Sequence, residues 1–235
     1  MITELEKVKI QRVAGQHKGV DSDVVIFEAE VLLRLNGKSY RSFYCLPTHL
    51  EEMAQGYLIS EGVCSLSGIK GIKARWDGER FVVKATIDGR GTKLNRINSA
   101  IKISVADIWA AIEQLNKHSI LFTKTGGAHV AGIFSGCNSV FAEDVSRHCA
   151  IDKAIGIACQ KGVMLTTSVL VASCRQTEST IRKAAYSRIP IVISTSAVSS
   201  LAIESAHKYG ITLIGFARER RFNIYAHKER ITGND

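Results

Sequence analysis

Three arginines follow the last strongly apolar segment of the chain, and their chemistry is that of an anion site. The run Ile211–Phe216 has the composition of a buried strand. Open α/β sheets bind ligands at the carboxyl ends of their strands, and guanidinium groups pair with phosphate oxygens in a bidentate way. The candidate anion-binding residues are Arg218, Arg220 and Arg221, with Glu219 among them. The alternative is a solvated charged turn between two strands.

A second group of polar side chains lies in the segment Glu143–Gly156. The pattern predicts a helix in which His148 and Asp152, four residues apart, share one face. That face could be the floor of a polar site or an exposed turn with surface ion pairs. His129, His148 and Cys149 are also metal-ligand types, but no fixed ligand spacing supports a metal site.

Two adjacent glycines, Gly126 and Gly127, precede His129 at the start of a strand-like segment. Adjacent glycines let backbone amides approach a ligand closely. The phosphate-loop pattern G-x-x-x-x-G-K-[ST] is absent from the sequence. His129 fits a hydrogen-bonded structural histidine as well as a functional one.

The six cysteines include no C-x-x-C pair, which argues against a zinc ribbon or a thioredoxin-type redox pair. Three lie in apolar segments and are expected in the core: Cys45, Cys159 and Cys174. Cys64 and Cys137 lie near predicted turns and could be exposed. Cys149 follows His148, and nearby positive charge favours the nucleophilic thiolate. Cys149 is therefore the best-placed candidate nucleophile, and Cys137 is the other.

The composition is that of a globular protein with an anionic partner. The chain has 235 residues, 46% of them hydrophobic, and a net charge of +9. No nucleic-acid motif, signal-peptide pattern or apolar run long enough for a membrane helix is present. We expect a cytoplasmic protein with reduced thiols that binds neither nucleic acid nor membrane. A phosphate-bearing cofactor would account for part of the positive charge.

The first hundred residues are predicted to be mostly β. Extended runs flank Asn36-Gly37 and Asp77-Gly78, and both dipeptides are strong hairpin signals.

One helix and one loop are predicted within this β-rich part. Residues 47–62 have a helical pattern, in which Thr48 and Glu51 have capping-box spacing and Gly62 is the expected stop. Residues 87–100 show no periodicity and are predicted to be a loop at a domain boundary.

From residue 101 onward, strand and helix patterns alternate, with Ser104 as the predicted cap of the first helix. The predicted helices are 104–119, 143–162, 177–188 and 199–210, and the predicted strands are 125–136, 163–173, 189–195 and 211–217. Such alternation implies a largely parallel sheet with helices on its faces. The expected fold class is α/β, with a β-rich N-terminal subdomain (1–100) and an α/β domain (101–235).

Several of these motifs, in this order, resemble the FdhD/NarQ family of formate dehydrogenase accessory proteins. The resemblance extends from about Asp23 to Ile231. It rests on the segments YCLPTHLEEMAQGYLISEGV, TGGAHVAGIF, EDVSRHCAIDKAIG and the C-terminal segment from IPIVISTS to AHKERI.

The resemblance implies a cytoplasmic, usually homodimeric sulfur carrier with a cytidine-deaminase-like layered α/β core. Such a carrier takes sulfur from a cysteine desulfurase. It passes the sulfur to the molybdenum or tungsten bis-molybdopterin guanine dinucleotide cofactor of the formate dehydrogenase catalytic subunit. The family's guanine-nucleotide and cofactor segment corresponds here to Phe216, Ala217, Arg218, Glu219, Arg220 and Arg221.

The chain departs from the family pattern at the sulfur-carrying cysteine. The family places it in a C-x-x-C loop, but the equivalent residues 87–99 contain no cysteine. Smaller departures are Cys149, where the family usually has Asn, and Ser146, where it usually has Gly. Three hypotheses follow: a sulfur carrier that uses another cysteine, a cofactor-binding chaperone without sulfur transfer, or an unrelated activity on a deaminase-like fold. The absence of a C-x-x-C pair argues against a zinc deaminase.

Overall fold

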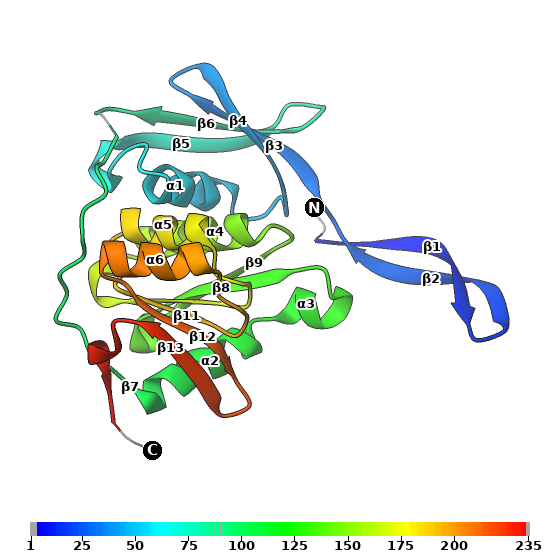
Figure 1. Ribbon diagram of the computed structural model, residues 1–235. Coiled ribbons are helices and arrows are strands. Elements are labelled where there is room, and N and C mark those ends of the chain that lie inside the picture. Colours follow the sequence, from blue (N-terminus) through cyan, green and yellow to red (C-terminus); the bar gives the residue numbers. More distant parts are fainter. Residues whose placement is uncertain (1–3, 90, 234–235) are drawn as a thin grey trace.

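The computed structural model describes residues 4–89 and 91–233, and it is built around one six-stranded sheet (Figure 1). Its strands are β8 (His129–Phe134), β9 (Val140–Asp144), β10 (Val169–Ala172), β11 (Ile191–Ser194), β12 (Thr212–Arg218) and β13 (Arg221–Ala226). They lie in the order β13-β12-β11-β10-β8-β9. Strands β10, β11 and β12 are parallel, and the outer pairings are antiparallel. The predicted α/β class is confirmed, but the expectation of a largely parallel sheet is wrong, because three of the five strand pairings in the described sheet are antiparallel.

Helices cover both faces of this sheet (Figure 1). Three of them, α4 (Arg147–Gln160), α5 (Glu178–Tyr186) and α6 (Ser200–Tyr209), pack on one face around Leu170, Val192 and Leu213. The helix α2 (Val105–Lys117) packs on the other face, against strand side chains such as Val171 and Ile193 that point away from α4, α5 and α6. The short helix α3 (Ile120–Thr125) follows α2 in the chain. This arrangement follows from the period-2 alternation of strand side chains.

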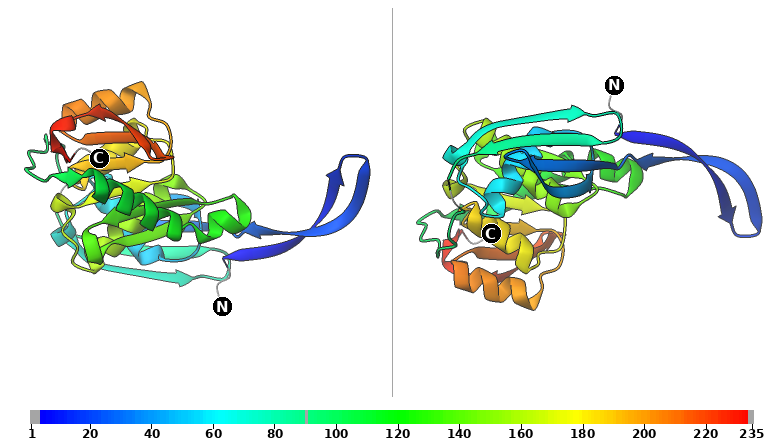
Figure 2. Two further views of the ribbon diagram at one scale, coloured as in Figure 1. Left: turned by 90° about the horizontal axis from the view of Figure 1, so that it is seen from below. Right: turned by 90° about the horizontal axis from the view of Figure 1, so that it is seen from above.

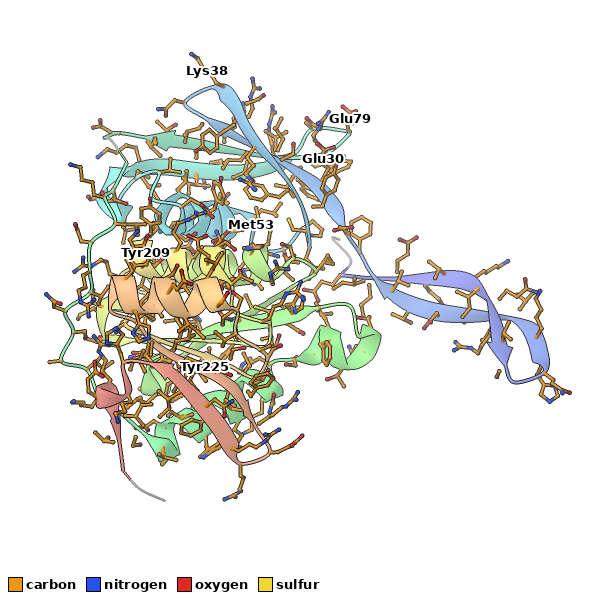
Figure 3. The ribbon with its side chains drawn as sticks, in the orientation of Figure 1. Glu30, Lys38, Met53, Glu79, Tyr209 and Tyr225 are labelled. Atoms are coloured by element: carbon orange, nitrogen blue, oxygen red, sulfur yellow. The ribbon has the colours of Figure 1, made fainter. Side chains whose placement is uncertain are left out.

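A second sheet lies above α1 (Leu50–Ser60), and α1 lies against α4 (Figure 1). Its strands are β3 (Ala29–Leu35), β4 (Lys38–Cys45), β5 (Ile69–Trp76) and β6 (Phe81–Ile87), in the order β4-β3-β6-β5. The two predicted hairpin turns are confirmed, with β3–β4 joined at Asn36-Gly37 and β5–β6 joined around Gly78. Met53 of α1 lies inside the resulting core and is fully buried (Figure 3).

A long hairpin projects from these layers (Figure 2). It pairs β1 (Leu5–Ala14) with β2 (His17–Ile26) over ten residues each, and most of its residues are exposed. The hairpin is not among the elements predicted from the sequence. The remaining short elements are β7 (Ile103–Ser104), β14 (Ile231–Thr232), η1 (Leu66–Gly68), η2 (Gly136–Asn138), η3 (Leu165–Thr167) and η4 (Lys228–Arg230).

Several predicted element ends are confirmed and others are wrong. Ser104 caps α2 by accepting a hydrogen bond from the Asp107 amide. The capping box at Thr48 is wrong, because α1 begins after His49 and has no side-chain cap there. The side chain of Glu51 instead accepts a hydrogen bond from the Ala74 amide of the neighbouring sheet. Tertiary contact thus decides the role of this carboxylate.

The observed starts of one helix and one strand also differ from the predicted starts. Residues 143–144 belong to β9 rather than to the helix, which begins at Arg147. The strand predicted from residue 163 begins at Val169, since a 3₁₀ turn precedes it. The predicted loop 87–100 contains no helix and no strand beyond Ile87 among its described residues, and Arg90 lies outside them. None of the helices in residues 4–89 and 91–233 is both long and apolar enough to cross a bilayer.

Candidate functional site

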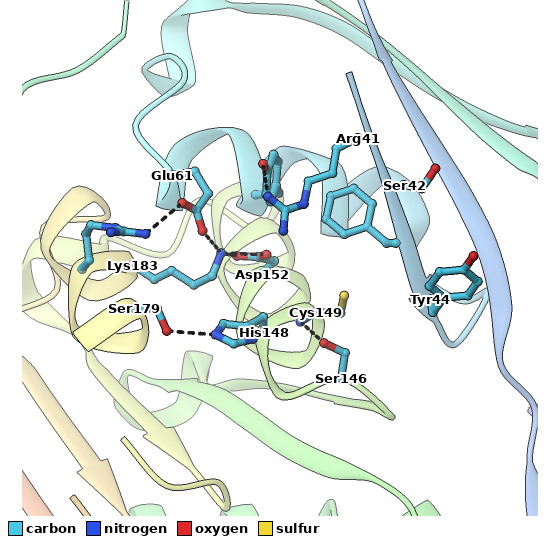
Figure 4. Close-up of a pocket in the computed structure, with 13 residues that line it drawn as sticks. Arg41, Ser42, Tyr44, Glu61, Ser146, His148, Cys149, Asp152, Ser179 and Lys183 are labelled. Carbon is cyan, nitrogen blue, oxygen red and sulfur yellow. Dashed lines mark hydrogen bonds and ion pairs between the residues drawn. The ribbon is translucent and has the colours of Figure 1, made fainter. Parts of the chain in front are cut away.

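A polar cavity of about 460 Å³ lies where β4, α1, α4 and α5 meet (Figure 4). It brings together side chains from four segments that are far apart in the sequence. Its lining includes Arg41, Tyr44, Tyr57, Glu61, Ser146, His148, Cys149, Asp152, Ser179, Arg182 and Lys183. His148 and Asp152, predicted to share a helix face, both line it. The polar-site interpretation of this helix is therefore correct, and the exposed-turn interpretation is wrong.

A buried ion-pair network forms the floor of the cavity. The Lys183 ammonium donates to both Asp152 carboxylate oxygens, at 2.8 and 3.0 Å, and lies 2.8 Å from Glu61 Oε1. Ser60 Oγ donates to Asp152 at 2.6 Å. Burial opposes the charge on Lys183, but the two carboxylates outweigh it and raise the pKa of Lys183. The network holds α1, α4 and α5 together and keeps Lys183 charged.

A second buried ion pair fixes the start of α4. Lys153 Nζ lies 2.7 Å from Asp144 Oδ2 and donates to the Leu46 carbonyl at 2.9 Å. Asp144 Oδ1 accepts from the Ser146 amide at 2.8 Å. Both side chains of the pair are fully buried. These contacts anchor the turn before α4 to the core. Ser146, His148 and Cys149, which lie in or just after this turn, line the cavity.

His148 is a neutral imidazole at physiological pH. Burial is the main cause, with the charges of Lys183 and Arg147 adding to it, and together they lower the pKa of His148 to about 4. Its Nε2 lies 3.1 Å from Ser179 Oγ. A neutral ring beside a cavity can donate or accept a hydrogen bond with a group that binds there.

Cys149 lines the same cavity, although its side chain is only 3% exposed. Its amide donates to Ser146 Oγ at 3.4 Å, so it lies in the first turn of α4. Cys45 of β4 lies behind it. A hydrogen bond to Cys149, together with burial, strongly raises the pKa of Cys45. Cys45 also contacts the Met53 sulfur at 3.6 Å.

The other cysteines are placed differently. Cys137 is exposed in the turn between β8 and β9. Because β8 runs antiparallel to β10, this turn lies at the end of the sheet where β10, β11 and β12 begin. The expectation of an exposed Cys64 is wrong, because its side chain is only 1% exposed in the core around α1. Cys45 and Cys174 are buried as predicted, and Cys159 is partly exposed.

Arg41 supplies a cation at the rim of the cavity (Figure 4). Its Nη1 donates to the Tyr57 hydroxyl at 3.3 Å, and its guanidinium lies over the rings of Phe43 and Tyr57 at 5.6 and 5.5 Å. Thiol, neutral imidazole and guanidinium thus surround one space that solvent can enter. This combination can bind an anionic group and move a proton to or from it.

The predicted phosphate segment forms the tight hairpin between β12 and β13. Glu219 and Arg220 both have φ of 54°, and Arg218 pairs with Arg221 across the turn. Residues 218–221 are exposed. A cavity of about 510 Å³ opens beside them, and it is lined by Trp109, Glu113, Asn116, Thr195, Ala217, Arg218 and Arg220, among others. The solvated-turn alternative is therefore confirmed for residues 218–221, and anion binding at the adjoining cavity stays a prediction.

Sequence reasoning missed four members of the first cavity: Arg41, Tyr57, Glu61 and Lys183. Tyr57 and Glu61 lie in a segment that contributes to the family resemblance, Arg41 and Lys183 lie outside the quoted motifs, and only the tertiary structure brings all four to His148. For Lys183 a weak signal exists, because it lies between Ile181 and Ala184 on a helix whose apolar residues are buried. Within the residues that the structure describes, no three His, Cys, Asp or Glu side chains are placed to hold a metal ion.

Sequence comparison with known proteins matches almost the whole chain to a single family. A sequence model of the FdhD/NarQ family matches residues 26–96 and 87–232. A sulfur carrier protein FdhD from Methanothermobacter thermautotrophicus is 33% identical over 225 residues, covering 88% of this chain and 91% of the relative. One from Wolinella succinogenes is 32% identical over 255 residues, covering 97% and 89%.

A solved structure has the same fold. It is the crystal structure of a proposed formate dehydrogenase accessory protein from Desulfotalea psychrophila, which superposes with a TM-score of 0.87. It is 25% identical to this chain, and the match covers 98% of this chain and all of the other. The arrangement of the two sheets and their helices is thus not peculiar to this sequence.

Proposed function

Since the chain belongs to the FdhD/NarQ family, we propose that it is a formate dehydrogenase maturation factor that carries sulfur. Its relatives along most of its length are named sulfur carrier proteins, which supports this role. A sulfur carrier needs a cysteine thiolate, because only a thiolate both attacks and releases sulfane sulfur. The described part of the usual carrier loop contains no cysteine, so another thiol must act.

Cys149 is the carrier in this proposal, and the supporting observation is its position in the cavity next to His148. It starts a helix that begins at the end of the sheet where β12 ends, the end that also presents Arg218. Cys137 lies at the opposite end of the sheet. A carrier at Cys137 would therefore be a strand length away from the proposed cofactor segment.

The transfer step is an exchange without net oxidation. The Cys149 thiolate attacks the terminal sulfur of a desulfurase cysteine persulfide. A new sulfur–sulfur bond forms at Cys149, and the desulfurase cysteine leaves as a thiolate. The proton lost by the Cys149 thiol passes to the leaving desulfurase thiolate, since the low pKa of His148 makes its ring a weak base. Arg41 is placed to stabilise negative charge in the cavity during this exchange.

The cargo proposed for the second cavity is the molybdenum or tungsten bis-molybdopterin guanine dinucleotide cofactor. The exposed guanidinium groups of Arg218 and Arg220 line this cavity, and Arg221 follows them in the same turn, which supports binding of a guanine nucleotide diphosphate there. The proposed partners are a cysteine desulfurase and the formate dehydrogenase catalytic subunit. A homodimer in the cytoplasm and a cytidine-deaminase-like arrangement of the core belong to the same proposal.

The test is incubation with a cysteine desulfurase and L-cysteine, followed by intact mass analysis. We expect the mass of one additional sulfur atom, lost in Cys149→Ser and retained in the control Cys137→Ser. Reductant should remove it. If wild type gains no sulfur while guanosine diphosphate still binds, the sulfur-carrier role is contradicted. The protein would then act as a cofactor-binding chaperone.

A further inference from the structure

Three basic side chains gather along the end of the central sheet at which β8 begins and β10 ends. His129 begins β8, Arg175 follows β10, and Arg147 begins α4. The Val130 amide donates to Ser173 Oγ at 3.0 Å, and the Ser173 amide donates to the Val130 carbonyl at 2.9 Å. These bonds hold the start of β8 against the segment that carries Arg175.

Strand pairing brings the three segments together. His129 lies opposite Asp144 in the β8–β9 ladder and Ala131 lies opposite Ala172 in the β8–β10 ladder, and Arg147 and Arg175 each follow three residues after those partners. Burial lowers the pKa of His129, and the charges of Arg147 and Arg175 lower it further. The same two charges act on the neighbouring Cys174, whose pKa burial raises to about 11. Positive charge is thus concentrated where like charges repel each other.

No carboxylate among the described residues balances this concentration. The nearby acids are engaged elsewhere: Asp144 pairs with Lys153, Glu178 pairs with Arg182, and Glu143 accepts from the Leu121 and Phe122 amides. Arg147 Nε is buried and has no hydrogen-bond partner in the described part of the chain.

An unpaired buried donor is costly, and an anion bound at this place would give Arg147 Nε a partner. The fourteen-residue helix α4 also directs its positive end to this place. We propose that His129, Arg147 and Arg175 form an oxyanion site that binds a phosphate or diphosphate group. Neither cavity described above includes these three residues.

The position of this site indicates what it would contribute. Strands β11 and β10 separate β12 from β8 in the sheet. Three strand spacings place His129 about 14 Å from the end of β12, which carries Arg218. A ligand with two diphosphate groups could therefore occupy both places at once. This identification of the ligand rests on the proposed cofactor role, whereas oxyanion binding itself does not.

The experiment is a calorimetric titration at fixed salt with two probes, inorganic pyrophosphate and guanosine diphosphate. For pyrophosphate, we expect Arg147→Gln and Arg175→Gln each to weaken binding by about tenfold or more. The control Lys161→Gln removes one charge at the other end of α4 and should stay within about twofold of wild type. Arg175 is exposed, so its variant should fold even if Arg147→Gln does not.

The outcomes separate the proposals. Absence of pyrophosphate binding in wild type, or equal losses in the control, contradicts the oxyanion site whatever the sulfur assay gives. Pyrophosphate binding that requires Arg175, combined with failed sulfur transfer, supports the site and contradicts the carrier role. If guanosine diphosphate binds at two sites, of which Arg175→Gln removes one and Arg218→Ala the other, the nucleotide is the source of both anions. Binding of pyrophosphate alone at the Arg175 site assigns it to a free anion.

Discussion

Gly56 of α1 and Gly156 of α4 place the backbones of the two helices in direct contact. A Cβ atom on Gly56 would lie 1.8 Å from the Asp152 carbonyl oxygen and 2.9 Å from the Gly156 nitrogen. One on Gly156 would lie 1.9 Å from the Glu52 carbonyl oxygen. This approach lets Ser60 of α1 donate to the Asp152 side chain of α4. The floor of the first cavity therefore depends on the absence of a Cβ atom at both glycines.

Gly156→Ala should destabilise the protein, because the added methyl group meets backbone atoms that cannot rotate away. We expect a loss of about 1–3 kcal/mol or more in the free energy of unfolding, measured by urea denaturation. The matched control is Gly71→Ala, where nothing lies within 4 Å of the added atom. Equal stability of the two variants would contradict the close helix contact.

Lys183→Met should also destabilise the protein, because it leaves Asp152 and Ser60 without their buried cation. Breaking a buried ion pair costs about 3–5 kcal/mol in the free energy of unfolding. The double variant with Asp152→Leu should recover part of that loss, since no unpaired buried charge remains. The exposed pair of Lys117 and Glu113 is the control, and Lys117→Met should change stability little. A Lys183→Met loss no larger than that control would show that the network adds no stability.

The low pKa of His148 predicts a particular acid sensitivity. The ordinary pKa of a histidine is 6.5 and that of His148 is about 4 in the folded state. Between these values the unfolded chain binds a proton that the folded chain does not, so stability falls as the pH falls through this window. The loss should be roughly 1–2 kcal/mol once partial solvent exposure is allowed for.

His148→Gln should therefore lose less stability than wild type between about pH 6.5 and pH 4. Urea denaturation across that range gives the difference between the two proteins, in which the other titrating groups largely cancel. Parallel curves for wild type and variant would contradict the neutral, buried imidazole.

Guanosine diphosphate should bind at the β12–β13 hairpin. We expect Arg218→Ala and Arg220→Ala each to weaken binding by about ten- to a hundredfold, since each removes a charge-assisted hydrogen bond. Arg221→Ala should act likewise if its side chain turns towards the same ligand. Calorimetry at fixed salt measures the affinities. Should wild type bind while all three variants match it within about twofold, the nucleotide site lies elsewhere.

The sequence predicted the local parts of the site better than their assembly. The four-residue spacing of His148 and Asp152 placed them on one helix face, and both line the cavity. It did not place Lys183 or Arg41 beside them, because periodicity reports which face of a helix is buried and not which helix it meets. The parallel pairing of β3 with β6 could not be predicted either, because α1 and β5 lie between the two strands in the chain and periodicity does not indicate which strands pair.

The hairpin of arginines was only half predicted. The apolar run up to Phe216 is a buried strand, as expected, and residues 218–221 follow it. Glu219 and Arg220 form the turn with positive φ values. Glu and Arg rarely adopt this conformation, so their presence in a sequence does not predict such a turn. The N-terminal hairpin was missed entirely, because its exposed strands show no one-sided apolar alternation.

The projecting β1–β2 hairpin should behave as a separate unit in the native-state energy landscape. Its ladder of ten paired residues on each strand is exposed over most of its length, and Val13 and Val20 are 65% and 82% exposed. A two-stranded ribbon without a packed face is only marginally stable. Its amide protons should exchange with deuterated solvent through local opening, long before those of β10 and β11. The slowest-exchanging amides would then report the unfolding of the central sheet alone.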